Sequence, residues 1–234
     1  MTNLFLRHAE VLNEKNIQYA NLPGFQISDQ GKEQSVAAGK LLKNRNYKIE
    51  KIITSPLLRA RETSSIISEI LKIPIFFSNN LTEWTGINNW IGKTLKEIKT
   101  SQKYLEITSS LDLNPVDETL KSVYKRVEIE YKNNGNTLFV SHQDTIRAFT
   151  YYFTNDQNFS MYRPENCEIQ FIENNSFEYN FILHGQEMQE FLYHGGLLVD
   201  VKITEKNMNV FLENTKPRFQ QLKNAYLECI KKDL

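Results

Sequence analysis

Two short apolar segments of the sequence lead directly into residues that can do chemistry. Leu4-Phe5-Leu6 is followed by Arg7-His8, and Leu138-Phe139-Val140 is followed by Ser141-His142. Strands more often end in turn-forming residues such as Gly, Asn or Pro. Histidine is the side chain that exchanges protons most readily near neutral pH. Both segment ends are therefore candidate functional positions.

A third apolar segment, Lys51–Thr54, ends in Ser55-Pro56, and Arg59 stands at the start of the helix expected after it. In open α/β sheets, ligands bind beyond the carboxyl ends of the strands. If the three segments are neighbouring strands, they bring two histidines and two arginines to one crevice. Arginine binds phosphate oxygens with two parallel hydrogen bonds, and helix N-termini add further N–H donors. The combination predicts a site for a phosphoryl group.

Composition narrows the class of protein. The 234 residues are 40% hydrophobic and 24% charged, which is enough for one globular domain with a substantial core. Basic and acidic residues are equal in number at 28 each, so no charge excess points to nucleic acid or to a membrane surface. Two cysteines, no signal-peptide pattern and no apolar stretch of transmembrane length favour a cytoplasmic protein.

The hydrophobic pattern alternates between strand and helix signals. Strands are expected at 2–6, 51–54, 74–77 and 138–140, and helices at 28–42, 59–71, 118–131 and from 143 to 149. Pro74 marks an edge strand, whereas residues 79–98 are expected to be mostly irregular. Alternation at 167–172 and 177–183 predicts a late hairpin. The fold class predicted is a three-layer α/β/α sandwich around a central, mostly parallel sheet.

The sequence pattern changes from about residue 204 to the C-terminal end. We expect residues 1–203 to form the α/β domain and residues 204–234 to form a C-terminal helical extension. In that extension, four residues fall on one helical face: Phe219, Leu222, Tyr226 and Cys229. The stripe predicts packing on the domain or a subunit contact, and thus a possible homodimer.

The sequence resembles the histidine phosphatase superfamily, also called the phosphoglycerate mutase-like family, and within it a phosphatase branch. Six signatures occur in the family's order between about residues 3 and 150. They are Arg7-His8-Ala9, 27–35, 54–63, Leu81-Thr82-Glu83 with Trp90-Ile91-Gly92, a weakened Asp117-Glu118-Thr119, and Val140-Ser141-His142-Gln143. Ala9 and Gln143 each replace a glycine of the family, and both are expected to narrow or reshape the pocket.

The resemblance implies a role for each matching residue. His8 would be the nucleophile that forms a phosphohistidine, with Arg7, Arg59 and His142 around the phosphoryl oxygens. Glu83 would protonate the leaving alkoxide and then deprotonate the attacking water.

Two further residues would bind substrate, and no metal or cofactor is required. Gln143 follows the second histidine. Many family members have an asparagine six residues after the nucleophile, where this chain has Glu14. Asn13 instead matches a phosphatase branch in which the asparagine lies one residue earlier.

The predicted function is metal-independent hydrolysis of a phosphate monoester, with a small phosphorylated metabolite as substrate. One alternative is a phosphoglycerate mutase, which returns the phosphoryl group to the substrate. True mutases of the family usually follow the nucleophile with Gly-x-Ser, whereas this chain has Ala9-Glu10-Val11. The other alternative is a protein that binds phosphate esters without turnover.

Two rival interpretations of the site are weighed against these roles. A metal site could draw on His8, His142, Glu10 and Asp144, but no HxH or HExxH spacing occurs and the neighbouring arginines would repel a cation. Glu10 competes with Glu83 for the role of the acid, and we favour Glu83.

Overall fold

The computed structural model describes residues 2–45, 47–100, 118–154, 164–173, 176–183, 186–194 and 197–201. Its strands form one sheet in the order β3-β2-β4-β1-β5-β6-β7-β8. Their bounds are β1 (Asn3–Arg7), β2 (Lys51–Thr54), β3 (Ile75–Phe77), β4 (Thr137–Ser141), β5 (Ile169–Glu173), β6 (Ser176–Leu183), β7 (Gln186–His194) and β8 (Leu197–Val201). The predicted edge position of the strand after Pro74 is confirmed, because β3 ends the sheet.

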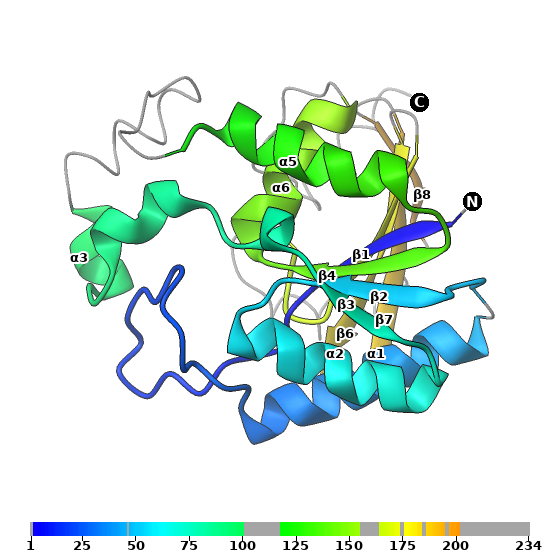
Figure 1. Cartoon of the computed structure of the whole chain (residues 1–234), viewed down its shortest axis with the longest axis horizontal. Coiled ribbons are helices and arrows are strands. Elements are labelled where there is room, and N and C mark those ends of the chain that lie inside the picture. The colour runs from blue at the N-terminus through cyan, green and yellow to red at the C-terminus, as the bar shows by residue number, and fades with distance from the viewer. Residues whose placement is uncertain are drawn as a thin grey trace.

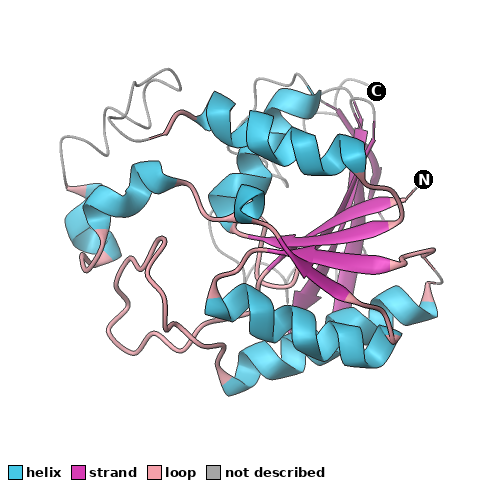
Figure 2. Cartoon of the chain, viewed as in Figure 1, coloured by secondary structure: helices cyan, strands magenta, loops and turns pink. Residues whose placement is uncertain are grey.

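Helices cover both faces of the parallel part of this sheet. The α-helices of the described residues are α1 (Asp29–Asn44), α2 (Leu58–Leu71), α3 (Leu95–Lys99), α5 (Leu120–Asn133) and α6 (Gln143–Thr154), of which α3 lies away from the sheet. Helices α1 and α2 lie together on one face, and α5 and α6 lie together on the other (Figures 1 and 2). The three-layer α/β/α arrangement predicted from the sequence is confirmed.

The sheet has a parallel and an antiparallel half. Strands β3, β2, β4 and β1 pair in parallel. From β1 onward each pairing is antiparallel, through β5, β6, β7 and β8. The predicted late hairpin is confirmed as β5–β6, whereas the sequence did not predict β7 and β8. The parallel character therefore belongs to the half of the sheet that carries the candidate site, and the sheet as a whole is mixed.

Two other regions refine the predictions. The segment expected to be irregular contains two short 3-10 helices, Asn79–Leu81 and Thr85–Trp90, followed by α3. The C-terminal extension at 204–234 lies outside the described residues. Within the described residues, no helix combines the length and apolarity needed to span a membrane.

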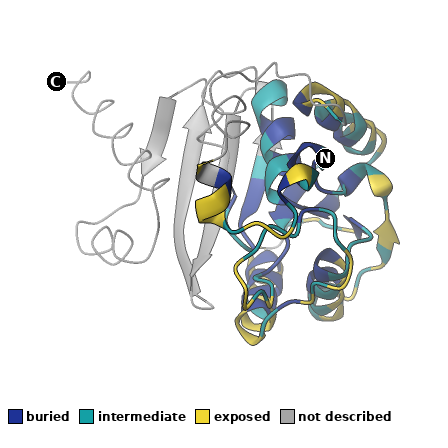
Figure 3. Ribbon diagram, turned by 90° about the vertical axis from the view of Figure 1, so that its left-hand side faces the viewer, coloured by how far each residue is buried: buried dark blue, intermediate teal, exposed yellow. Residues whose placement is uncertain are grey.

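The core has a different character on each face of the sheet. On the side of α5 and α6, Phe5 packs against Phe139 and Phe149, with ring centroids 5.1 and 4.8 Å away. On the side of α1 and α2, an aliphatic cluster includes Leu4 and Leu6. Strands β1 and β4, which carry Leu4, Phe5, Leu6 and Phe139, are buried. Figure 3 shows buried strands at the centre of the part of the chain that it colours by burial. Burial on both faces explains why these strands are continuous apolar runs.

The start of α1 ties the loop after β1 to the helix layer. The hydroxyl of Ser28 caps α1 by accepting the Gly31 N–H at 3.0 Å, and it donates to the Glu10 carboxylate at 2.7 Å. The N–H of Ser28 also donates to the Glu10 carbonyl. A methyl group placed on Gly31 would lie 2.3 Å from that carbonyl oxygen. Glycine is therefore required here by close approach.

We expect Gly31→Ala to destabilise the protein by about 1–3 kcal/mol, because an added methyl must displace the Glu10 backbone. Helix propensity alone predicts the opposite sign, a gain of up to about 1 kcal/mol. Urea unfolding measures the difference. Lys40→Ala, at an exposed position of the same helix, is the control and should change stability by less than about 0.5 kcal/mol. A Gly31→Ala variant as stable as the wild type would contradict the close-approach argument.

Candidate active site

Three neighbouring strands end at the same edge of the sheet. In the parallel register, Arg7 pairs with Ser141, and Thr54 pairs with Val140. Backbone hydrogen bonds continue one residue beyond each pairing, from His8 N–H to the Ser141 carbonyl at 2.9 Å and from Ser55 N–H to the Val140 carbonyl at 3.0 Å. His8, His142 and the start of α2 are therefore brought together, as the strand-end motifs predict.

The imidazole of His8 is held in one tautomer. Its Nδ1 lies 2.8 Å from the carbonyl oxygen of Ala9, which can only accept a hydrogen bond, so Nδ1 carries the proton of the neutral ring. The Arg59 Nε–H donates to Nε2 at 3.3 Å. Nε2 is thus the nitrogen with the lone pair, and a guanidinium lies directly beside it.

Both histidines are kept neutral by their surroundings. The side chain of His8 is 2% exposed, and burial followed by the charges of Arg59 and Arg7 holds its pKa well below the usual value. Burial and Arg59 likewise hold the pKa of His142 well below its usual value. The two rings lie 5.1 Å apart. At neutral pH the lone pair on His8 is therefore available for nucleophilic attack.

Arg59 is enclosed by the loop that precedes α1. The residue is 1% exposed, and its guanidinium donates to the carbonyl oxygens of Ala20 at 2.6 Å and Leu22 at 3.4 Å. The guanidinium also lies 4.8 Å from the ring centroid of Tyr19, at cation–π distance. These contacts fix a buried cation beside His8 without neutralising it.

Arg7 and His142 each keep a polar atom unsatisfied. Among the described residues, three buried side-chain polar atoms lack a hydrogen-bond partner: Arg7 Nε, His142 Nδ1 and Ser64 Oγ. Buried polar groups in proteins are nearly always paired. Two of these three belong to predicted site residues, so these residues keep polar atoms that a ligand could satisfy. Arg7 is held from the other side by donation to the Pro164 carbonyl at 2.9 Å.

Glu83 has the environment of a carboxyl group that can hold a proton near neutral pH. It is 6% exposed, and its Oε1 accepts the Trp84 N–H at 2.8 Å. The Thr145 hydroxyl lies 3.3 Å from the same oxygen. Burial, and next the charge of Asp144, raises the pKa of Glu83 to about 7. The nearby charges of Arg59 and Arg7 act in the opposite direction and are smaller causes.

The competing carboxyl group of Glu10 is used elsewhere. It is partly exposed and accepts the Ser28 hydroxyl at the start of α1. Glu83, in contrast, is buried, and Arg59 and Arg7 act on its pKa. The structure thus favours Glu83 over Glu10 as the acid.

The other predicted substrate contacts stay predictions. Asn13 exchanges two hydrogen bonds with the backbone of Ile17, at 2.8 and 3.3 Å, and so organises the loop itself. Gln143 is partly exposed and is the first residue of α6, next to His142.

Ala9, which is expected to narrow or reshape the pocket, packs in the core, and its effect on the pocket stays a prediction. Ala9 is fully buried and belongs to the aliphatic core cluster. Its N–H donates to the Thr63 hydroxyl at 3.0 Å, and its carbonyl accepts the His8 Nδ1 proton. The methyl group is therefore accommodated by the core.

Sequence reasoning missed several residues that contact the predicted ones. Ser55 lies 2.7 Å from His142 Nε2, Thr145 contacts Glu83, and Tyr19 contacts Arg59. Ser55 could have been found from the sequence, because it directly follows a predicted strand in one of the motifs. No sequence pattern points to Thr145 or Tyr19, since each contacts a residue in a distant part of the chain.

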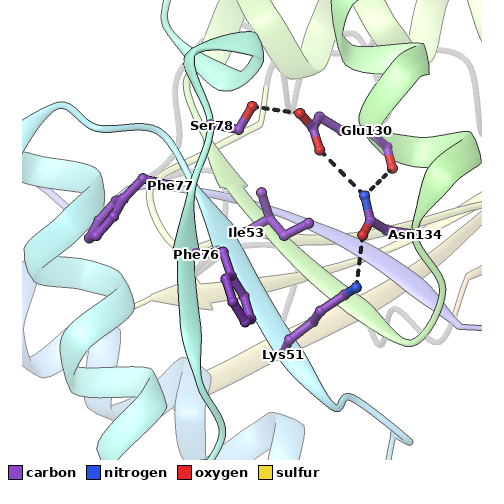
Figure 4. Close-up of a pocket in the computed structure, with 7 residues that line it drawn as sticks. All are labelled: Lys51, Ile53, Phe76, Phe77, Ser78, Glu130 and Asn134. Carbon is purple, nitrogen blue, oxygen red and sulfur yellow. Dashed lines mark hydrogen bonds between the residues drawn. The ribbon is translucent and has the colours of Figure 1, made fainter.

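A separate pocket of about 310 Å³ lies between β2, β3 and α5 (Figure 4). None of the seven residues lining it is a predicted site residue: Lys51, Ile53, Phe76, Phe77, Ser78, Glu130 and Asn134. Its polar groups bond to one another, with Lys51 donating to Asn134 at 2.7 Å and Ser78 donating to Glu130 at 2.6 Å. Across the described ranges, no group of three or more His, Cys, Asp or Glu residues is placed to hold a metal ion.

Fold and site together define an α/β protein with two neutral histidines and two arginines at the carboxyl ends of its parallel strands. A family model of the histidine phosphatase superfamily (branch 1) matches residues 4–185. The chain belongs to that superfamily and is a phosphomonoesterase- or mutase-like enzyme.

Solved structures share the fold at low sequence identity. A mycobacterial glucosyl-3-phosphoglycerate phosphatase is 19% identical with a TM-score of 0.61, over 76% of this chain and 89% of that one. A phosphoserine phosphatase from Entamoeba histolytica, solved with 3-phosphoglyceric acid, is 18% identical with a TM-score of 0.62, over 87% and 98%. A putative α-ribazole-5′-phosphate phosphatase from Escherichia coli is 19% identical with a TM-score of 0.59, over 75% and 92%.

The raised pKa of Glu83 predicts a pH-dependent difference in stability between the wild type and Glu83→Gln. Between the usual value of 4.5 and about 7, the folded protein holds a proton that the unfolded chain has lost. Wild-type stability relative to the variant should therefore fall by about 3 kcal/mol as pH rises through this window. Urea unfolding of both proteins from pH 5 to 8 measures it.

Asp144→Asn provides a second arm of that experiment. It retains Glu83 and removes the neighbouring charge that, after burial, raises the pKa of Glu83. The pKa of Glu83 in the folded protein should therefore fall, and the pH range over which stability is lost should end at a lower pH. A constant stability difference between wild type and Glu83→Gln across the whole range would refute the raised pKa.

Proposed function

We propose that this protein hydrolyses phosphate monoesters of small metabolites through a phosphohistidine on His8, without a metal ion. The observation that carries the proposal is the neutral, buried imidazole of His8, with its Nε2 lone pair beside Arg59. A buried neutral imidazole is a nucleophile, and a fixed guanidinium stabilises the charge of a phosphoryl group in transfer.

In the first half-reaction, His8 Nε2 attacks phosphorus and forms an N–P bond while the P–O bond of the ester breaks. Arg7, Arg59 and the His142 side chain surround the phosphoryl oxygens and stabilise the transition state. The leaving alkoxide takes the proton of Glu83 and departs as an alcohol. The pKa of about 7 supports this role, because a large fraction of Glu83 holds its proton at neutral pH.

In the second half-reaction, water attacks phosphorus and the N–P bond breaks. The Glu83 carboxylate takes a proton from that water, so both groups return to their starting states and inorganic phosphate leaves. Since one carboxyl acts first as acid and then as base, a pKa near the working pH suits both steps.

The mutase alternative uses the same groups but returns the phosphoryl group to a phosphoglycerate. Ala9-Glu10-Val11 after the nucleophile favours hydrolysis, as do the phosphatase names of the three similar structures. Phosphoryl release to water, compared with transfer between phosphoglycerates with and without 2,3-bisphosphoglycerate, distinguishes the two. Binding without product release would indicate the non-catalytic alternative.

We expect hydrolysis of an aryl phosphate to survive EDTA and to fall at least about 1000-fold in His8→Ala, because the nucleophile is lost. Brief incubation of the wild type with ³²P-labelled substrate should give an acid-labile, base-stable label that the variant lacks. Circular dichroism establishes that the variant is folded. Turnover that is indifferent to His8, or abolished by the chelator, would refute the proposal.

Arg59 and Arg61 offer a matched pair on α2. Arg59→Lys keeps the charge but loses the planar fork, and we expect kcat/KM to fall by about 100-fold. Arg61 is exposed and lies 5.5 Å from the Phe77 ring centroid, so Arg61→Lys should stay within about twofold of the wild type. Equal losses in the two variants would show that Arg59 does not contact the phosphoryl group.

A further inference from the structure

The imidazole of His142 is bound to a hydroxyl group that the proposed reaction does not use. His142 Nε2 lies 2.7 Å from Ser55 Oγ, and both residues are fully buried. The Ser55 N–H donates to the Val140 carbonyl at 3.0 Å, so the backbone pairing of β2 with β4 holds the hydroxyl against the ring. The contact is therefore fixed by the sheet.

Counting protons gives the direction of this hydrogen bond. A serine hydroxyl has one proton and two lone pairs. Ser55 Oγ already accepts the Leu57 N–H at 3.3 Å. If it also accepted a proton from Nε2, its own buried proton would have no acceptor among the described residues, which is unfavourable. Donation from Ser55 to Nε2 uses both the proton and an acceptor site of the hydroxyl, and leaves only His142 Nδ1 without a partner.

This direction places the remaining proton of the neutral imidazole on Nδ1. His142 Nδ1 is buried and has no partner among the described residues. His8 and Arg59 lie near the ring of His142, and neither carries a negative charge. An N–H group on Nδ1 is therefore matched by a ligand that supplies acceptor oxygens.

We propose that Ser55 is a positioning residue for His142: its hydroxyl fixes the tautomer in which Nδ1–H is the donor to a phosphoryl oxygen. The inference rests on the proposed function for its last step, the contact with the phosphoryl group. The tautomer itself is a property of the protein without substrate.

Two-bond ¹H–¹⁵N NMR spectra of the ligand-free protein at neutral pH test the tautomer. We expect His142 to carry its proton on Nδ1 in the wild type and to lose that preference in Ser55→Ala. Ser55→Cys retains a side chain of similar size but offers only a weak donor, so it should behave like Ser55→Ala. A wild-type proton on Nε2, or an unchanged tautomer in both variants, would overturn the proposal.

Turnover and phosphate binding test the consequence. Removing one donor to a developing oxyanion costs about 100–1000-fold, and a merely biased tautomer costs less, so kcat/KM should fall about 10-fold in both Ser55 variants. Ser64→Ala is the matched control, because Ser64 is an equally buried serine whose hydroxyl has no partner in the described residues. An equal loss in Ser64→Ala would reduce Ser55 to a packing role.

Inorganic phosphate should move the His142 Nδ1–H resonance downfield in the wild type, and an unmoved resonance at saturating phosphate would overturn the contact. Failure of the proposed function has a different signature, namely turnover that persists in His8→Ala. The tautomer in the ligand-free protein does not depend on that result.

Discussion

The parallel register of β1, β4 and β2 is the constraint on which the candidate site depends. It aligns three strand ends, so that two histidines and the start of α2 meet at one edge. A slip of one residue would turn Phe5 into the aliphatic layer and Leu4 and Leu6 out of it, because successive side chains point to opposite faces. The burial that stabilises the fold therefore also fixes the chemistry. Apolar burial alone is therefore enough to set the register of these strands.

Burial at this edge sets the protonation states that the chemistry needs. Burial, and after it the charge of Arg59, holds the pKa of each histidine low, so both are neutral. The same exclusion of water raises the pKa of Glu83 to about 7. The cost of the buried guanidinium is offset by the carbonyl groups of the loop around it. One physical cause, burial, thus sets the protonation states of His8, His142 and Glu83 that the proposed reaction uses.

The sequence predicts the features that depend on a short run of neighbouring residues, and it does not predict contacts between residues far apart in the chain. The apolar runs before His8 and His142 specify buried strands, and Ser28 caps α1 as predicted. Strand β7 was missed because its segment, QEMQEFLYH, has no strict alternation of apolar and polar residues. The contacts of Ser55 with His142 and of Thr145 with Glu83 join positions 87 and 62 residues apart. No local pattern records such a contact, since only the folded sheet brings the partners together.

The two histidines differ in what holds their tautomers, and this bears on how the site tolerates sequence change. His8 is oriented by the backbone carbonyl of residue 9, which every amino acid supplies. Alanine can therefore stand there, provided that its methyl fits the core, as it does. His142 is oriented by a side-chain hydroxyl, so only a few residue types at position 55 preserve its donor direction. The alanine at position 9 therefore leaves the orientation of His8 unchanged, whereas the loss of the hydroxyl at position 55 would change the hydrogen bonding of His142.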